Sequence, residues 1–161
     1  MPGGLSPYWL ATCARLSRRV EGERVAPGTS ADAASFGTVV LVATPFDALP
    51  QVGADYSPLM QGKVVICCSN PSRNNPSPLS QDALERGSGV VSAELFPGVR
   101  LTRAFNAINF RFVESEAHRP GEKVGIPVAG DDEDAVRVTS EHRGPMPTAR
   151  TALYGGQRTP R

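Results

Sequence analysis

Residues 38–47, TVVLVATPFD, decide the fold, and residues 63–72, KVVICCSNPS, repeat the same pattern. Each segment is a short, unbroken apolar run that ends at a small polar residue followed by proline. A strand that is apolar at every position must be covered on both faces, and parallel sheets flanked by helices provide that environment. Ligands of such sheets bind beyond the carboxyl ends of the strands. The ends of these two segments are therefore the predicted place of a ligand.

The composition is typical of a globular protein rather than of a nucleic-acid or membrane protein. The chain has 161 residues, of which 40% are hydrophobic and 20% charged, enough for one domain with a core. Its formal net charge of +1 gives no electrostatic reason to expect nucleic acid or a membrane surface as a partner. No apolar run approaches the roughly 20 residues that span a bilayer, and the N-terminal segment lacks the apolar stretch of a secretory signal. We therefore expect a cytoplasmic protein.

Alternating strand and helix patterns predict an α/β fold with a doubly wound, mostly parallel sheet. The connections are long enough for parallel crossovers. The four predicted strands are residues 38–44, 64–68, 100–104 and 126–129. The ends of the chain are expected to lie outside this domain: residues 1–27 are poorly patterned, residues 28–142 carry the alternation, and residues 143–161 form a basic tail predicted to be disordered.

The connecting segments carry their own signals. Residues 30–35 are expected to form a helical turn capped by Thr29 or Ser30. A short helix is predicted after Pro45, with Pro50 as an interruption, and residues 113–123 are expected to be a polar loop. The acidic residues 131–134 predict the start of a helix, because carboxylates there complement its exposed amides.

Four segments resemble the NADP oxidoreductase, coenzyme F420-dependent family, and they keep its order and spacing over residues 28–142. They are GTSADAASFGTVVLVATPFDALP (28–50), GKVVICCSNP (62–71), SAELFPGVRLTRAFNAINF (92–110) and PVAGDDEDAV (127–136). The more specific pieces are LTRAFNAIN (101–109) and PVAGDD (127–132). The resemblance implies the fourth to sixth strands of a Rossmann-like NAD(P)-binding domain, with NADP as cofactor and coenzyme F420 as its hydride partner.

The sequence also departs from that family. Family members begin with a strand and G-x-G-x-x-G, a turn that lets the pyrophosphate approach a helix N-terminus. This sequence has no such motif, because Gly3-Gly4 and Gly155-Gly156 have neither its spacing nor its context. The polar end of the family's second strand, which holds the adenosine ribose, is missing too. The sequence therefore predicts an incomplete Rossmann-like domain that lacks the first glycine-containing βαβ unit and is truncated on its N-terminal side.

Residues at three predicted strand ends are candidates for cofactor binding by this resemblance. They are Thr44, Pro45, Phe46, Asn70, Pro71, Ala104, Phe105 and Asn106. Asn106 is the strongest candidate, because an amide at a strand end can hydrogen-bond a carboxamide or the edge of a deazaflavin. Structural roles stay open: Phe46 in the core, and Asn70 and Asn106 as caps of the turns that follow them. No Ser–His–Asp set or Cys–His pair predicts a catalytic nucleophile, and Asp131 and Asp132 are interpreted as helix-capping residues rather than metal ligands.

Hydride transfer requires little acid–base chemistry from a protein, since the cofactor carries the reaction and the protein aligns the two rings. The leading hypothesis is an NADP-dependent oxidoreductase that passes hydride between NADP(H) and F420 or a related acceptor, impaired by the missing glycine turn. The alternative is a non-catalytic α/β remnant or a partner-binding module without a dinucleotide site. A small molecule is the expected partner, and the sequence leaves open whether the chain forms a homo-oligomer.

Overall fold

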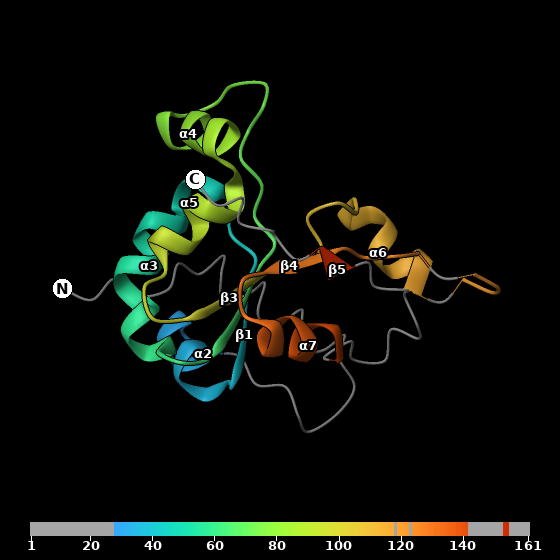
Figure 1. The fold of residues 1–161 in the computed structure, drawn as a ribbon, viewed down its shortest axis with the longest axis horizontal. Helices are drawn as coiled ribbons and strands as arrows, with labels where there is room; N and C mark the ends of the chain where they lie inside the picture. The colour runs from blue at the N-terminus through green and yellow to red at the C-terminus, as the bar shows by residue number, and fades with distance from the viewer. Residues whose placement is uncertain (1–27, 118, 123, 142–152, 155–161) are drawn as a thin grey trace. The chain divides into compact units, whose positions relative to one another are not determined.

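A computed structural model describes residues 28–117, 119–122, 124–141 and 153–154 (Figure 1). The chain divides into two units, Met1–Gly37 and Thr38–Arg161. The N-terminal segment 1–27 and most of the tail 143–161 lie outside the described residues. Within the described part, no helix combines the length and apolar character needed to cross a membrane.

The described part of the first unit is the helix α2, Ser30–Phe36, with its cap. The Thr29 hydroxyl accepts a hydrogen bond from the Asp32 amide at 3.1 Å, and the Asp32 carboxylate accepts one from the Thr29 amide at 2.9 Å. This capping box satisfies two amides that a helix start leaves free. The bond from the Thr29 amide to the Asp32 carboxylate, and then a bond from the Thr29 hydroxyl at 2.8 Å, lower the pKa of Asp32. The predicted helical turn with Thr29 as its cap is confirmed.

The second unit is built on a sheet whose described strands follow the order β1-β2-β3-β4-β5. Their bounds are Val39–Val42, Val64–Cys67, Arg100–Arg103, Val128–Gly130 and Leu153–Tyr154. The strands β1, β2 and β3 are parallel and in register, with Val39 beside Val64 and Val64 beside Arg100. β4 runs antiparallel to β3, and β5 runs parallel to β4. The predicted α/β fold with a mostly parallel sheet is confirmed, while β5 places two residues of the C-terminal tail in a strand.

Helices connect these strands. A 3-10 turn at Phe46–Ala48, α3 at Leu49–Tyr56 and a second 3-10 turn at Ser57–Met60 lead from β1 to β2. The helices α4, Pro78–Arg86, and α5, Ser88–Leu95, lead from β2 to β3. α6, Phe110–Ala117, lies between β3 and β4, and α7, Glu133–Glu141, follows β4.

Neighbouring residues of β3 contact helices on opposite faces of the sheet. The Thr102 and Thr139 hydroxyls, from β3 and α7, share a buried hydrogen bond of 2.8 Å. Arg103, the next residue, donates to the Ser92 hydroxyl of α5 at 3.0 Å. Successive side chains of a strand point to opposite faces, so α7 covers one face and α5 the other, as Figure 1 shows. This double cover explains why all four residues of β2 are buried.

The helices α3 and α5 pack with their backbones in close approach. A Cβ atom at Gly53 of α3 would lie 1.9 Å from the carbonyl oxygen of Leu95 in α5. Because a real Cβ atom does not come so near a backbone oxygen, only glycine fits at this crossing. Leu49 and Phe96, 0% and 1% exposed, belong to the core of this unit.

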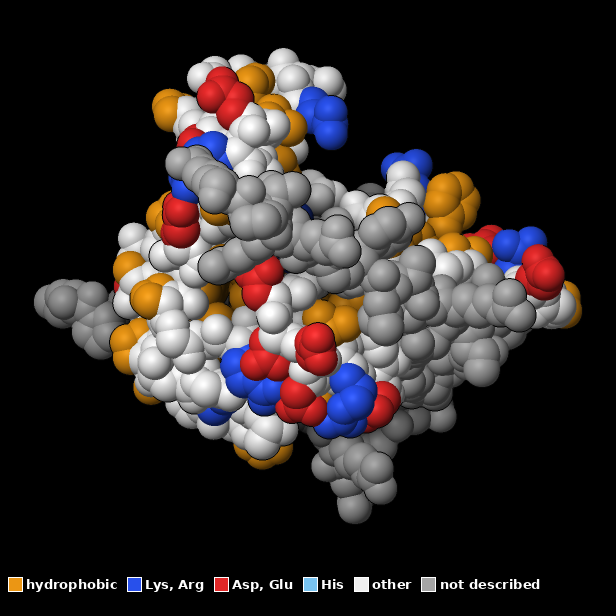
Figure 2. All heavy atoms as spheres, viewed as in Figure 1, with side chains coloured by type: hydrophobic (Ala, Val, Ile, Leu, Met, Phe, Trp, Pro, Cys, Tyr) orange, Lys and Arg blue, Asp and Glu red, His pale blue; other side chains and the backbone are white. Residues whose placement is uncertain are grey.

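A charged network fixes the start of α7. The Arg100 guanidinium donates to both carboxylate oxygens of Asp132, at 2.8 and 2.9 Å, and to Asp134 at 2.6 Å. Asp132 also accepts the Ala135 amide at 2.8 Å. Arg100, and then this amide, lower the pKa of Asp132 well below its usual range. Figure 2 shows acidic and basic side chains gathered over this helix. Asp132 caps the helix, as its sequence context predicts.

Three predictions about the connections are wrong. Pro50 does not interrupt a helix: it lies in the first turn of α3, where its missing N–H costs no hydrogen bond. Residues 113–117 are not loop but the end of α6. That helix starts next to Asn109, whose side-chain oxygen accepts the Arg111 amide at 3.0 Å. The fourth strand is Val128–Gly130 rather than residues 126–129, because only those residues pair with neighbouring strands.

Candidate functional site

The carboxyl ends of β1, β2 and β3 meet at one edge of the sheet and are tied together by Ser69. The Ser69 hydroxyl donates to the main-chain oxygen of Thr44 at 2.6 Å. The main-chain oxygen of Ser69 accepts the side-chain amide of Asn106 at 3.1 Å. Three residues that are far apart in the sequence thus lie beside one another where ligands of such sheets bind.

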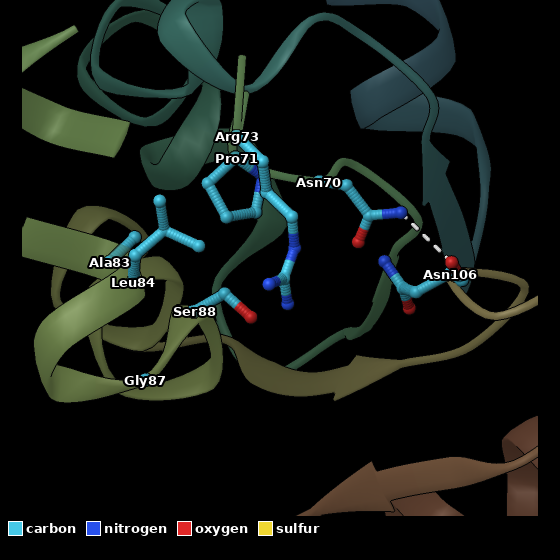
Figure 3. A pocket seen from close by; sticks show the side chains of 8 residues that line it. All are labelled: Asn70, Pro71, Arg73, Ala83, Leu84, Gly87, Ser88 and Asn106. Atoms are coloured by element: carbon cyan, nitrogen blue, oxygen red, sulfur yellow. Dashed lines mark hydrogen bonds between the residues drawn. The ribbon is translucent and has the colours of Figure 1, made fainter. Parts of the chain in front are cut away.

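Asn70 and Asn106 join the ends of β2 and β3. The Asn70 side-chain amide donates to the main-chain oxygen of Asn106 at 2.8 Å, the contact drawn in Figure 3. The described contacts of both side chains therefore lead across the strand ends, not into the turns that follow them. Asn109 supplies the side-chain oxygen at the start of α6 instead.

Phe105, between the last residues of β3 and Asn106, has a backbone φ of 65°. A positive φ is unfavourable for a bulky side chain. Phe105 is half-buried and packs against the cluster of Val64, Ile66 and Ala135, which holds this conformation. Strained residues of this kind cluster at functional sites, where the surrounding structure maintains them.

A pocket of about 560 Å³ opens beside these strand ends. Its lining residues are Asn70, Pro71, Arg73, Ala83, Leu84, Gly87, Ser88 and Asn106, shown in Figure 3. They come from the ends of β2 and β3, the loop before α4, the last turns of α4, and its junction with α5. The size lies within the range of small-molecule sites, which combine an apolar wall with a few polar groups.

The structure brings Asn70, Pro71 and Asn106 together in this pocket, and the other predicted residues lie outside its lining. Phe46 and Ala104 are 4% and 1% exposed and belong to the core. Pro45 is exposed and precedes the first 3-10 turn. A role for these residues in cofactor binding stays a prediction.

Thr44 differs from the other predicted residues outside the lining. Its hydroxyl oxygen is buried and has no hydrogen-bond partner within the described part of the chain. A buried hydroxyl without a partner is costly, and a ligand or an ordered water can supply one.

Several residues of the site were missed in the sequence. Arg103 donates to the Ser69 main-chain oxygen at 2.7 Å and reaches the Asn70 side-chain oxygen at 3.5 Å. Its surroundings withdraw it from water, and this burial lowers the pKa of its guanidinium. An arginine inside a strand of an α/β sheet is the signal that marks it. Ser88 carried no comparable signal. Arg73, next to Asn74 and Asn75, is a possible phosphate contact by its sequence, although a solvated loop is the preferred interpretation there.

The residues present fit one half of a dinucleotide. The side-chain amides of Asn70 and Asn106 at the strand ends suit the polar edge of a nicotinamide. The pyrophosphate half has no matching glycine turn in this sequence. Among residues of the described ranges, no three His, Cys, Asp or Glu side chains come together as metal ligands do.

The fold defines the class: a doubly wound, Rossmann-like α/β protein, with a pocket beside the carboxyl ends of its parallel strands. No family model and no curated protein matches the sequence. Solved structures with a similar fold are known. The hypothetical protein SMa0349 from Sinorhizobium meliloti is 22% identical with a TM-score of 0.63, over 77% of this chain and 58% of that one.

A second solved structure is described as a putative F420-dependent NADP-reductase from Arthrobacter sp. FB24. It is 20% identical with a TM-score of 0.64, over 80% of this chain and 60% of that one. At these identities the likeness shows the Rossmann-like fold alone. The match spans less than two thirds of either neighbour's length.

Proposed function

We propose that this chain is an NADP-dependent oxidoreductase whose pocket holds the nicotinamide end of NADP(H) and passes hydride to F420 or a related acceptor. The observation that carries the proposal is the convergence of Asn70, Pro71 and Asn106 in one pocket at the carboxyl ends of parallel strands. The fold shared with a structure described as an F420-dependent NADP-reductase supports it at the level of architecture.

The chain's own residues would bind and orient the reacting ring. The side-chain nitrogen of Asn106 makes the bond to Ser69. The side-chain oxygen of Asn106 has no partner among the described residues, so this oxygen can accept an N–H of the nicotinamide carboxamide. Ala83 and Leu84 form an apolar wall that would exclude water from the ring. When bound, the nicotinamide supplies the hydride chemistry, and the protein contributes alignment.

The adenosine half of the cofactor should contribute little affinity. Without a glycine turn, the pyrophosphate has no cradle of amides at a helix start. We therefore expect this chain to bind NADPH more weakly than micromolar, and no more tightly than reduced nicotinamide mononucleotide. Calorimetric titration with both ligands tests this, and micromolar affinity for NADPH would contradict it.

The proposal is tested by following the backbone amides of Ser69, Asn70 and residues 105–107 by NMR during titration with reduced nicotinamide mononucleotide. Saturable shifts there, followed by hydride transfer to added F420, are the expected result. A folded chain whose strand-end amides do not respond would overturn the proposal. The alternative, a non-catalytic module, is favoured by the absence of G-x-G-x-x-G in this sequence; binding without hydride transfer to any acceptor would support it.

A further inference from the structure

We propose that the α4–α5 side of this pocket holds an anionic group, a phosphate or a carboxylate, of the small molecule that binds there, with Arg73 as its main cation. The identity of that molecule as a hydride donor or acceptor rests on the proposed function. The anion site itself rests on the charges around the pocket.

Arg73 differs from most described arginines in having no acidic partner. Arg86, Arg100, Arg119 and Arg137 each form an ion pair with a carboxylate. For Arg73 the described part of the chain offers neither an ion pair nor a hydrogen bond. In Figure 3 its guanidinium extends into the pocket, with Ser88 on one side and the two asparagine amides on the other. A guanidinium without a partner, aimed into a cavity, is suited to bind a carboxylate or phosphate in a bidentate manner.

The start of α5 adds to this positive field. Gly87 and Ser88, at the first turn of α5, both line the pocket. No side chain caps this helix: the N-cap residue is Gly87, with φ 101°. The first amides of a helix carry partial positive charge and need acceptors. An anion beside Arg73 would supply an acceptor, and the Ser88 hydroxyl is a further donor.

Arg103 is a second cation beside the first turn of α5. The Arg103 side chain passes close to Gly89, 3.7 Å from where a Cβ atom there would lie, and bonds the strand ends through Ser69. Arg103 has no carboxylate partner within the described residues, and an arginine stays charged although burial lowers its pKa. None of the eight lining residues is acidic. The pocket therefore combines uncompensated positive charge with an apolar wall, which fits an organic anion.

The experiment uses the whole chain with inorganic pyrophosphate and citrate as probes, at constant ionic strength. The amides of residues 87–90 and the side-chain N–H signals of the arginines are followed by NMR. Wild type is compared with Arg73→Gln, Arg73→Lys and the control Arg137→Gln, which removes the same charge from α7. We expect saturable shifts at the start of α5, with affinity about tenfold lower in Arg73→Gln and partly restored in Arg73→Lys. The control should bind as the wild type does.

Tighter binding of pyrophosphate would assign the site to phosphates, and tighter binding of citrate would assign it to carboxylates. Shifts that do not saturate, or that are equal in Arg73→Gln and wild type, would overturn the proposal. Because neither probe contains a nicotinamide, anion binding that persists without any response to reduced nicotinamide mononucleotide would reject the proposed function and leave the anion site standing.

Discussion

Replacement of Asn106 by alanine should separate ligand binding from folding. The wild-type amide donates to the Ser69 main-chain oxygen at 3.1 Å, but that oxygen also accepts from Arg103 at 2.7 Å and keeps a partner in the variant. The bond from Asn70 goes to the main chain of residue 106 and survives as well. The free energy of unfolding should therefore fall by only about 0.5–1.5 kcal/mol.

The effect on ligand binding should be larger. The lost side-chain oxygen would leave a nicotinamide N–H unpaired inside the pocket, at a cost of about 1–3 kcal/mol. The rate of hydride transfer from reduced nicotinamide mononucleotide to F420 should fall roughly ten- to hundred-fold, measured in single turnovers by absorbance.

The matched control is Asn109→Ala, which removes the side chain that accepts the Arg111 amide at the start of α6. It should cost about 1 kcal/mol of stability, as lost helix caps do, and leave ligand binding unchanged. Equal turnover in Asn106→Ala and wild type would show that Asn106 only ties two strands together, and the assignment of the nicotinamide site would be wrong.

Gly53→Ala should lower the free energy of unfolding by about 1–3 kcal/mol in urea denaturation, because the new Cβ would lie 1.9 Å from the Leu95 carbonyl oxygen. Thr102→Val and Thr139→Val should each cost about 1–3 kcal/mol, since each leaves the other buried hydroxyl unpaired, whereas the double variant should be near wild type. Asp132→Asn should destabilise the chain at neutral pH. Because the native pKa of Asp132 is lowered, that carboxylate's contribution is complete above its unfolded pKa of about 3.9 and is lost as the pH falls.

Each of these three predictions has an outcome that contradicts it. Gly89→Ala is the control for the first, since its Cβ meets only the Arg103 side chain at an ordinary 3.7 Å. If it destabilises as much as Gly53→Ala, crowding at the α3–α5 crossing is not the cause. Additive losses in the threonine double variant would refute the unpaired-hydroxyl argument. A stability gap between Asp132→Asn and wild type that does not narrow below about pH 4 would exclude the carboxylate as its source.

Local chemistry determined much of the fold in advance. Unbroken apolar runs at β1 and β2 predicted strands covered on both faces. The full burial of β2 confirms this for β2, whereas β1 is only partly covered, with Leu41 56% exposed. Thr29 and Asp132 could be predicted as helix caps, because the side chain of a cap bonds a backbone amide about three residues further along the chain. The place of the pocket was predictable from topology alone, since parallel strands bring their carboxyl ends to one edge.

Other features depended on contacts that no local pattern contains. Ser88 is not marked in the sequence, and the sequence around Arg73 favours a solvated loop over a phosphate contact. Both residues line the pocket only because the crossover through α4 and α5 brings their segments beside the strand ends. Likewise, the sequence left open whether Asn70 and Asn106 cap the turns that follow them, and only the fold shows that the Asn70 side chain bonds the main chain of Asn106. Patterns of burial and capping act over one or two turns of chain and can be read from sequence. The cavity is formed between elements up to 36 residues apart, so its shape and charge were decided by tertiary packing.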